Sequence, residues 1–236
     1  MTERGMIFNG EMVRAILGGQ KTQTRRIVNW RGLSEGLNLN FSGLRVCEYP
    51  KGWVIESESR SSTEWRCQPT PCPFGAVGDR IWVRETFQGP LFDLEQMEAY
   101  QEDSSKFHKP EFCVYKADGK PAPEYFDADD NLHCGWRPSI HMPRWASRIT
   151  LEITGVRVER LNDISEEDAR AEGIIDGGCL NCGEPEPCNC SNPAPDATDA
   201  FAYLWQSIYG QENWNANPWV WVIEFKRIEG NLHATD

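Results

Sequence analysis

The chain has 236 residues, of which 39% are hydrophobic and 25% are charged, and this composition excludes a chain that is disordered throughout. Its 36 acidic residues outnumber its 24 Lys and Arg residues, and the net charge of −12 excludes a protein that coats nucleic acid without sequence preference. The sequence has no apolar run of the roughly 20 residues that a membrane span needs, and residues 1–5 lack the apolar stretch of a signal peptide.

These features predict a cytoplasmic protein that does not contact a membrane. In the cytoplasm the 9 cysteines would be reduced, and their odd number argues against a complete disulfide framework. The charge is uneven, because residues 1–31 hold six basic and two acidic residues, whereas residues 85–130 hold twelve acidic residues and four lysines. The basic part fits a small anionic ligand or a short strand, and we interpret the acidic part as a solvated insertion.

The first third of the chain predicts a strand, a helix and a second strand. Residues 6–8 form a short apolar run typical of a strand. The apolar residues of 10–17 fall on one stripe, which predicts a helix that ends at the glycine pair 18–19. Residues 21–28 are rich in Thr and end in apolar residues, which predicts a strand. Residues 29–75 are irregular in pattern.

The middle of the chain begins with a strand and continues as an insertion. Gly78 and Asp79 form a turn signal, and the strand is predicted over residues 80–84. Within the insertion we expect a helix near residues 91–100 and a strand near residues 112–115.

The last third alternates strands and helices. Apolar residues alternate from Ile149, and their phase shifts by one at Gly155, which predicts a strand with a β-bulge of the kind that bends a barrel. Helices are predicted over residues 165–172 and 201–208, and a closing strand from residue 219. Strands with interspersed helices and no repeating βαβ rhythm predict an α+β barrel or sheet.

One segment carries a recognisable motif. Gly19–Arg26 reads Gly-Gln-Lys-Thr-Gln-Thr-Arg-Arg, and it resembles the G-x-K-x-x-x-x-R signature of the ASCH family. Gly78–Val83 resembles the Gly-Asp strand entry of that family, Ile164–Gly173 its short acidic helix, and Trp219–Ile228 its closing strand. Residues 136–143 also resemble a segment of the larger phage and prophage ASCH proteins.

The resemblance covers about residues 6–28, 72–85 and 136–228. It implies an α+β fold, a PUA-like β-barrel with flanking helices. The chain would then be a single domain over residues 1–228 with a flexible tail at 229–236. Its long loop insertions would lie at about residues 29–71, 86–135 and 176–195.

The resemblance also implies a cleft suited to RNA or a nucleoside. Some small bacterial members of the family are N-acetylcytidine amidohydrolases that use a Lys, a Thr and a Glu. The matching positions are Lys21, Thr24 and Glu172. Other members are RNA-binding proteins or ribonucleases, so the family does not fix one activity.

The residues themselves set conditions on such chemistry. On a strand Thr22 and Thr24 share one face while Lys21 faces the other way, so Lys21 and Thr24 meet only where the strand bends. A desolvated Lys has a lowered pKa and can take the proton of a Thr hydroxyl, and Arg26 can orient a carbonyl or phosphate. Glu172 ends a helix, where the dipole disfavours a negative charge and favours a role in proton transfer. The alternative is that Glu172 is a solvated helix end and that Lys21 is a surface cation.

Most further candidates for ligand contact lie in two basic segments, residues 1–31 and residues 137–148. Trp145 lies beside a basic residue and can stack a base, whereas the other tryptophans are expected in the core. His141 is a candidate ligand contact or a structural hydrogen-bonding group. The full set of predicted ligand-binding residues is Thr22, Arg25, Arg26, Arg84, Arg137, His141, Arg144 and Trp145.

Four cysteines lie within twelve residues. Cys179, Cys182, Cys188 and Cys190 have nearly the spacing of a tetrahedral structural zinc site, although the second pair is one residue closer than usual. A Cys-rich loop without metal is the equal alternative, and no organic cofactor is expected. A second, weaker metal set consists of Cys67, Cys72, His133 and Cys134.

Three functions remain open on the sequence. The first is an amidohydrolase in which Thr24 attacks an N-acyl cytidine-type amide, Lys21 activates it and Glu172 serves the leaving amine. The second is a module that binds RNA, a nucleoside or a modified base without chemistry. The third, weaker one gives the acidic surface a role in binding a host factor. The oligomeric state is not predicted.

Overall fold

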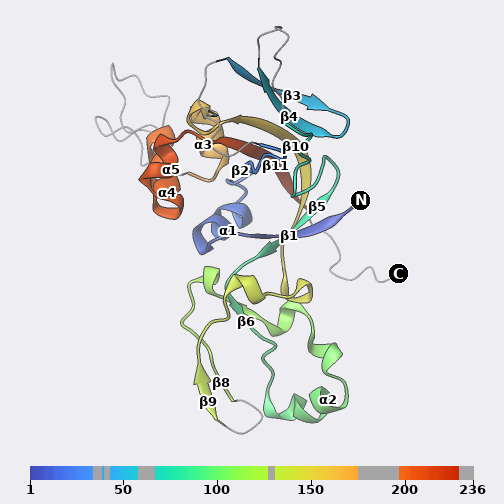
Figure 1. Cartoon of the computed structure of the whole chain (residues 1–236). Coiled ribbons are helices and arrows are strands. Elements are labelled where there is room, and N and C mark those ends of the chain that lie inside the picture. Colours follow the sequence, from blue (N-terminus) through green and yellow to red (C-terminus); the bar gives the residue numbers. More distant parts are fainter. Residues whose placement is uncertain (34–38, 40–42, 58–66, 127–130, 175–196, 229–236) are drawn as a thin grey trace, which may run out of the picture. The chain divides into compact units, whose positions relative to one another are not determined.

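The computed structural model describes residues 1–33, 39, 43–57, 67–126, 131–174 and 197–228 (Figure 1). The protein belongs to the α+β class, as predicted. The chain divides into two compact units. Unit 1 contains residues 1–19 and 78–152 and the described residues from 226 on, and unit 2 contains residues 20–77 and 153–225. In the described part of the chain, none of the helices combines the length and apolar character of a membrane span.

The sheet of unit 1 is built around β5 (Arg80–Arg84). β1 (Glu3–Ile7) pairs with β5 in parallel, and the first residues of β10 (Thr150–Arg160) pair with β5 in antiparallel fashion. α1 (Gly10–Leu17) begins where the Asn9 side chain accepts a hydrogen bond from the Met12 N–H. Its apolar stripe buries three side chains, which are Val13, Ala15 and Ile16.

The inserted part of unit 1 consists of short elements. β6 (Phe87–Gln88) pairs with β7 (Val114–Tyr115), and β8 (Glu124–Phe126) pairs with β9 (Leu132–Cys134). α2 spans Met97–Glu102. Single 3₁₀ turns occupy Leu94–Gln96, Ser104–Phe107, Pro110–Phe112, Lys116–Asp118, Ser139–His141 and Arg144–Ala146. Its core is formed by buried Phe87, Tyr115, Met142 and Ala146.

The strands of unit 2 carry the N-terminal motif. β2 (Gln23–Ile27) pairs in antiparallel fashion with β11 (Trp219–Ile228), and β11 lies next to β10. β3 (Leu44–Tyr49) and β4 (Gly52–Ser57) form a separate antiparallel hairpin.

Three helices of unit 2 pack against one another, namely α3 (Glu166–Ala171), α4 (Ala197–Tyr209) and α5 (Gln211–Asn215), after a 3₁₀ turn at Leu161–Asp163 (Figure 1). Ser165 caps α3 by accepting a hydrogen bond from the Asp168 N–H, as predicted. The Glu166 carboxylate accepts hydrogen bonds from the first two N–H groups of α4. The core beneath these helices contains Leu161, Ile164, Ala169, Ala197, Phe201, Trp205, Val220 and Val222.

The predicted barrel is not closed among the described residues. The strand order is β1-β5-β10-β11-β2, so β1 and β2 are edges of an open sheet. The glycine at position 155 has a local explanation, while the predicted β-bulge there stays a prediction. β10 runs through Gly155, and a Cβ there would lie 2.6 Å from Glu224 Oε2 on β11. Glycine therefore makes room for the Glu224 side chain.

We expect Gly155→Ala to lower the free energy of unfolding by about 1 kcal/mol, because the added methyl group displaces the Glu224 side chain. Urea denaturation followed by circular dichroism measures this change. Gly135→Ala is the matched control, since no atom lies within 4 Å of its Cβ position. A Gly155→Ala variant as stable as the wild type would contradict a close approach of Glu224 to this glycine.

Candidate functional site

The candidate site lies where the chain before β2 meets the end of α3. Lys21 forms an isolated antiparallel bridge with Glu172, which caps the C-terminus of α3. The Thr22 N–H donates to the Ala171 carbonyl oxygen at 2.8 Å, and the Thr22 carbonyl oxygen accepts from the Phe225 N–H at 2.8 Å. These backbone bonds hold Lys21 beside Glu172, although 151 residues separate them in sequence.

Lys21 and Glu172 form a buried ion pair. Lys21 Nζ lies 2.5 Å from Glu172 Oε2 and donates to the Glu172 carbonyl oxygen at 2.7 Å. The two residues are 2% and 4% exposed, so water does not screen the pair. The ammonium also satisfies a carbonyl at the end of α3, where a positive charge is favoured. The pairing of these two residues agrees with their predicted proximity, and their burial contradicts the alternative of a surface cation and a solvated helix end.

Arg25 adds a second cation to the same carboxylate. Its Nη1 lies 3.3 Å from Glu172 Oε1, and its Nη2 lies 2.5 Å from Glu159 Oε1 and 3.0 Å from Asp168 Oδ2. Arg25 is 1% exposed. One guanidinium thus joins three carboxylates that come from β10, from α3 and from the α3 cap.

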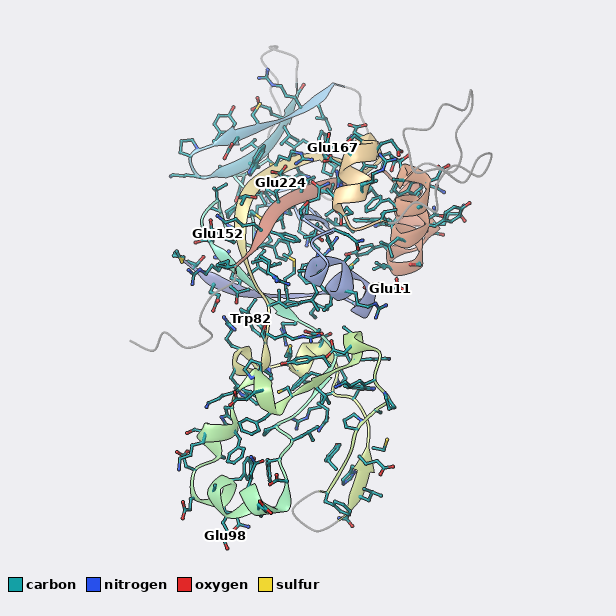
Figure 2. The ribbon with its side chains drawn as sticks, turned by 180° about the vertical axis from the view of Figure 1, so that it is seen from behind. Glu11, Trp82, Glu98, Glu152, Glu167 and Glu224 are labelled. Carbon is teal, nitrogen blue, oxygen red and sulfur yellow. The ribbon has the colours of Figure 1, made fainter. Side chains whose placement is uncertain are left out.

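Arg157 extends the network toward β11. It lies 3.1 Å from Glu159 Oε2 and 2.7 Å from Asp168 Oδ2, and it also bonds Glu224 Oε1. Figure 2 labels Glu224 on its strand, seen from behind. We name this network the paired-charge cluster, and its members are Lys21, Arg25, Arg157, Glu159, Asp168, Glu172 and Glu224.

Burial and neighbouring charges together set the pKa values in the cluster. Burial lowers the pKa of the Lys21 ammonium, the Glu172 carboxylate opposes this shift, and the neighbouring Arg26 and Arg25 add to it. For Asp168, burial acts to raise the pKa, but the charges of Arg157 and Arg25 outweigh it and hold that pKa below its ordinary value. Lys21 therefore gives up its proton more readily than a surface lysine, while Asp168 stays ionised.

Thr24 lies apart from this pair in its hydrogen bonding. Its side chain is fully buried, and Thr24 Oγ1 accepts a hydrogen bond of 2.8 Å from Arg26 Nη1. Among the described residues, no hydrogen bond joins Thr24 Oγ1 to Lys21 Nζ. Gln23 and Arg25 instead point with Lys21 toward α3, because Gln23 Nε2 donates to the Asp168 carbonyl oxygen at 2.6 Å. The strand alternation expected from the sequence accounts for this separation.

Two further predicted ligand residues lie in unit 1 and bond to its backbone. Arg84 Nε donates to the Ser139 carbonyl oxygen at 3.2 Å, and its guanidinium lies over the Trp82 ring. Arg137 Nη1 donates to the Gly89 carbonyl oxygen at 3.4 Å. These contacts are those of structural arginines that tie loops together.

The remaining predicted contacts also lie in unit 1. Arg144 forms a two-pronged ion pair with Glu3, with both N–O distances at 2.8 Å. The Trp145 ring stacks on His108, with centroids 4.8 Å apart and an interplanar angle of 15°. His141 is exposed in a 3₁₀ turn. The Trp145 face that touches His108 is thus already occupied by an aromatic partner.

The predicted zinc ligands Cys179, Cys182, Cys188 and Cys190 lie outside the described residues. Within residues that the structure describes, no group of three or more His, Cys, Asp or Glu side chains is arranged to hold a metal ion. The weaker set is divided between the units, with Cys67 and Cys72 in unit 2 and His133 and Cys134 in unit 1, and it stays a prediction.

Sequence reasoning missed most of the cluster's carboxylates. Asp168 was expected only to favour the first turn of α3. Arg157 and Glu159 lie two residues apart on β10 and so share one face of the strand, which was the available signal. A lone charged pair on a strand is otherwise typical of a solvated face, and only the tertiary structure shows its partners.

A second buried carboxylate, also missed, lies in unit 1. Glu85 is 1% exposed and receives two hydrogen bonds from Arg148, which also pairs with Asp118 and lies 3.9 Å from the centre of the Tyr115 ring. Burial raises the pKa of Glu85 despite the opposing charge of Arg148. Arg148 thus links the residue before the insertion, Glu85, to Asp118 within it.

Comparisons of the chain with models of known protein families, with curated proteins and with solved structures found no match. The functional argument therefore rests on the residues of this chain and on their geometry.

Proposed function

We propose that this chain is an ASCH-type, PUA-like protein that holds a nucleoside or nucleic-acid base at the paired-charge cluster and hydrolyses an N-acyl amide on a cytosine-type base. One observation carries the proposal, namely the buried contact of 2.5 Å between Lys21 Nζ and Glu172 Oε2. The two residues come from separate motifs of the sequence. A buried Lys with a lowered pKa is a group suited to proton transfer.

In the proposed reaction, the Thr24 hydroxyl oxygen forms a bond to the acyl carbon and loses its proton to the Lys21–Glu172 pair, after a side-chain rotation or through one water. The amide C–N bond breaks, and the exocyclic amine takes a proton from the Lys21–Glu172 pair. Water then hydrolyses the Thr24 ester to release the acid. Arg26 Nη1 already donates to Thr24 Oγ1, and such a cationic donor stabilises the alkoxide as it develops.

The charges of the site favour a neutral ligand over a nucleic-acid backbone. Lys21 and Arg25 are 2% and 1% exposed, and both are bound to carboxylates. A phosphate would have to displace those carboxylates from a buried position, which leaves them without a partner at a high cost in free energy. An uncharged base or nucleoside makes no such demand.

Incubation of the protein with N4-acetylcytidine tests the proposal, with released cytidine measured by chromatography. We expect turnover by the wild type and a loss of about 10²–10⁴-fold in kcat for Lys21→Met, because general acid–base catalysis contributes that much. Lys51→Met, at an exposed lysine, is the control and should keep full activity. If the wild type releases no cytidine, the amidohydrolase assignment is wrong.

A base-binding module without chemistry is the second candidate. The full burial of Thr24 and its lack of a hydrogen bond to Lys21 favour it. Binding of cytidine and of a short RNA, measured by calorimetry at two salt concentrations, separates the two ideas. Binding without turnover that is lost in a Lys21→Ala/Arg26→Ala double variant supports the module, and binding unchanged in that variant contradicts it.

A further inference from the structure

Arg25 was expected from the sequence to contact the ligand, and its surroundings indicate another role. Its side chain is fully buried, and the Phe201 ring centre lies 5.7 Å from its guanidinium carbon. The guanidinium is enclosed by the Phe201 ring and by three carboxylates. Both Nη atoms are already bound to carboxylates.

The three carboxylates that Arg25 joins are not equivalent. Glu159 and Asp168 also bond Arg157, so each is bound by two arginines. Glu172 is different, because its Oε1 atom contacts Arg25 while its Oε2 atom contacts Lys21. Its two oxygens are thus divided between the two cations.

We propose that Arg25 is a positioning residue, which fixes the Glu172 carboxylate through Oε1 so that Oε2 stays on the Lys21 ammonium. This role rests on the proposed function, in which the Lys21–Glu172 pair moves protons. Without the contact at Oε1, the carboxylate can rotate about its last bond and leave Lys21. The planar guanidinium suits this task, since its separate N–H groups reach several carboxylates at fixed angles, which a lysine ammonium does not do.

The charge of Arg25 has a consequence that can be measured on Lys21 alone. Arg25 and Arg26 are the positive neighbours that help to lower the Lys21 pKa, and Glu172 opposes them. The other charges around this pair are Glu159, Asp168, Arg157 and Glu224. Removal of the Arg25 charge by itself would therefore shift the Lys21 titration to higher pH, whereas release of the Glu172 carboxylate would shift it to lower pH.

The experiment combines a titration with kinetics. Carbon-13 labelling of the lysine ε-carbons lets nuclear magnetic resonance follow the Lys21 titration, with its signal assigned by Lys21→Met. We expect the wild-type Lys21 to titrate below its ordinary value of 10.5, the Arg25→Lys signal to titrate at lower pH than the wild type, and the Arg25→Gln signal to titrate at higher pH than Arg25→Lys. Arg157→Gln is the matched control, because it touches Glu159 and Asp168 but not Glu172, and its shift should be smaller.

Arg25→Lys separates position from charge. It keeps the positive charge, so a Lys21 titration at lower pH than in the wild type reports the release of the Glu172 carboxylate. It loses the planar guanidinium with its separate N–H groups, so kcat for N4-acetylcytidine should fall by about 10²-fold while KM changes little. This variant also serves if Arg25→Gln does not fold.

The outcomes distinguish the two proposals. A wild type that does not release cytidine contradicts the proposed function, while the Lys21 titration still reports on Arg25. An Arg25→Lys enzyme with wild-type kcat, or a Lys21 titration that is the same in Arg25→Lys and the wild type, would overturn the positioning role.

Discussion

Glu172→Gln is expected to lower the free energy of unfolding by about 3–5 kcal/mol, because it removes the carboxylate that two buried cations share. An amide accepts a hydrogen bond but carries no charge to offset Lys21 and Arg25. Loss of the Lys21 proton in the variant would recover part of that cost. Urea denaturation at pH 7, followed by circular dichroism, measures the change through the transition midpoint.

A double-mutant cycle of Glu172→Gln with Lys21→Met measures the interaction energy between these two side chains. The double variant should be less destabilised than the sum of the single variants, since removal of both partners leaves no stranded charge between them. Glu167→Gln is the matched control on the same helix, where Figure 2 labels Glu167 and its side chain is exposed, and it should change stability by no more than about 0.5 kcal/mol. A Glu172→Gln variant as stable as this control would refute the assigned role of the pair.

Thr24→Val is expected to reduce kcat for N4-acetylcytidine by about 10⁴-fold or more, because it removes the proposed nucleophile while it keeps the buried volume of the side chain. Valine has nearly the shape of threonine, which limits the change in packing at this fully buried position. The loss of the oxygen also leaves Arg26 Nη1 without its 2.8 Å acceptor, although the Arg25 carbonyl oxygen still accepts from that atom. Steady-state kinetics measure the effect.

Thr24→Ser is the control for this substitution, since it keeps the hydroxyl and loses only a methyl group. It should retain activity within about tenfold of the wild type. Cytidine release by Thr24→Val at the rate of Thr24→Ser would show that the oxygen of residue 24 does not attack the substrate, and water would then be the nucleophile of an active enzyme.

Local patterns predicted the main elements well. The helix over 10–17 and the strand over 80–84 have the predicted bounds, and the helix capped by Ser165 follows the expected hydrogen bond. In each case a periodic stripe or a turn signal lies within one short window of sequence. The single-domain prediction stays a prediction, since the structure describes two compact units one by one.

Two kinds of feature were not predicted, namely very short elements and features that depend on distant contacts. The hairpin of β8 and β9 has three residues in each strand, and the five residues of α5 are too few to show a periodic stripe. The β-bulge inferred from the phase shift at Gly155 stays a prediction, and the structure adds that one side chain from β11 approaches this glycine. A sequence window does not contain that neighbour.

At the candidate site, too, local patterns were predicted and contacts between distant elements were not. Alternation along β2 placed Lys21, Gln23 and Arg25 on one face, and the structure agrees. The family resemblance paired Lys21 with Glu172 across the chain. No local pattern indicated that Arg25 would meet carboxylates from two other elements, because that depends on how β10 and α3 approach β2.

The paired-charge cluster also restricts how this protein can change. A single substitution at Lys21, Arg25 or Glu172 strands an ion in the interior, whereas concerted replacement of such a network by apolar side chains of similar volume is often neutral or stabilising. Variants in which only some of these charged residues are replaced are therefore less stable than the intact network or its complete apolar replacement. A replacement of the buried charges that keeps the stability of the protein therefore requires several substitutions made together.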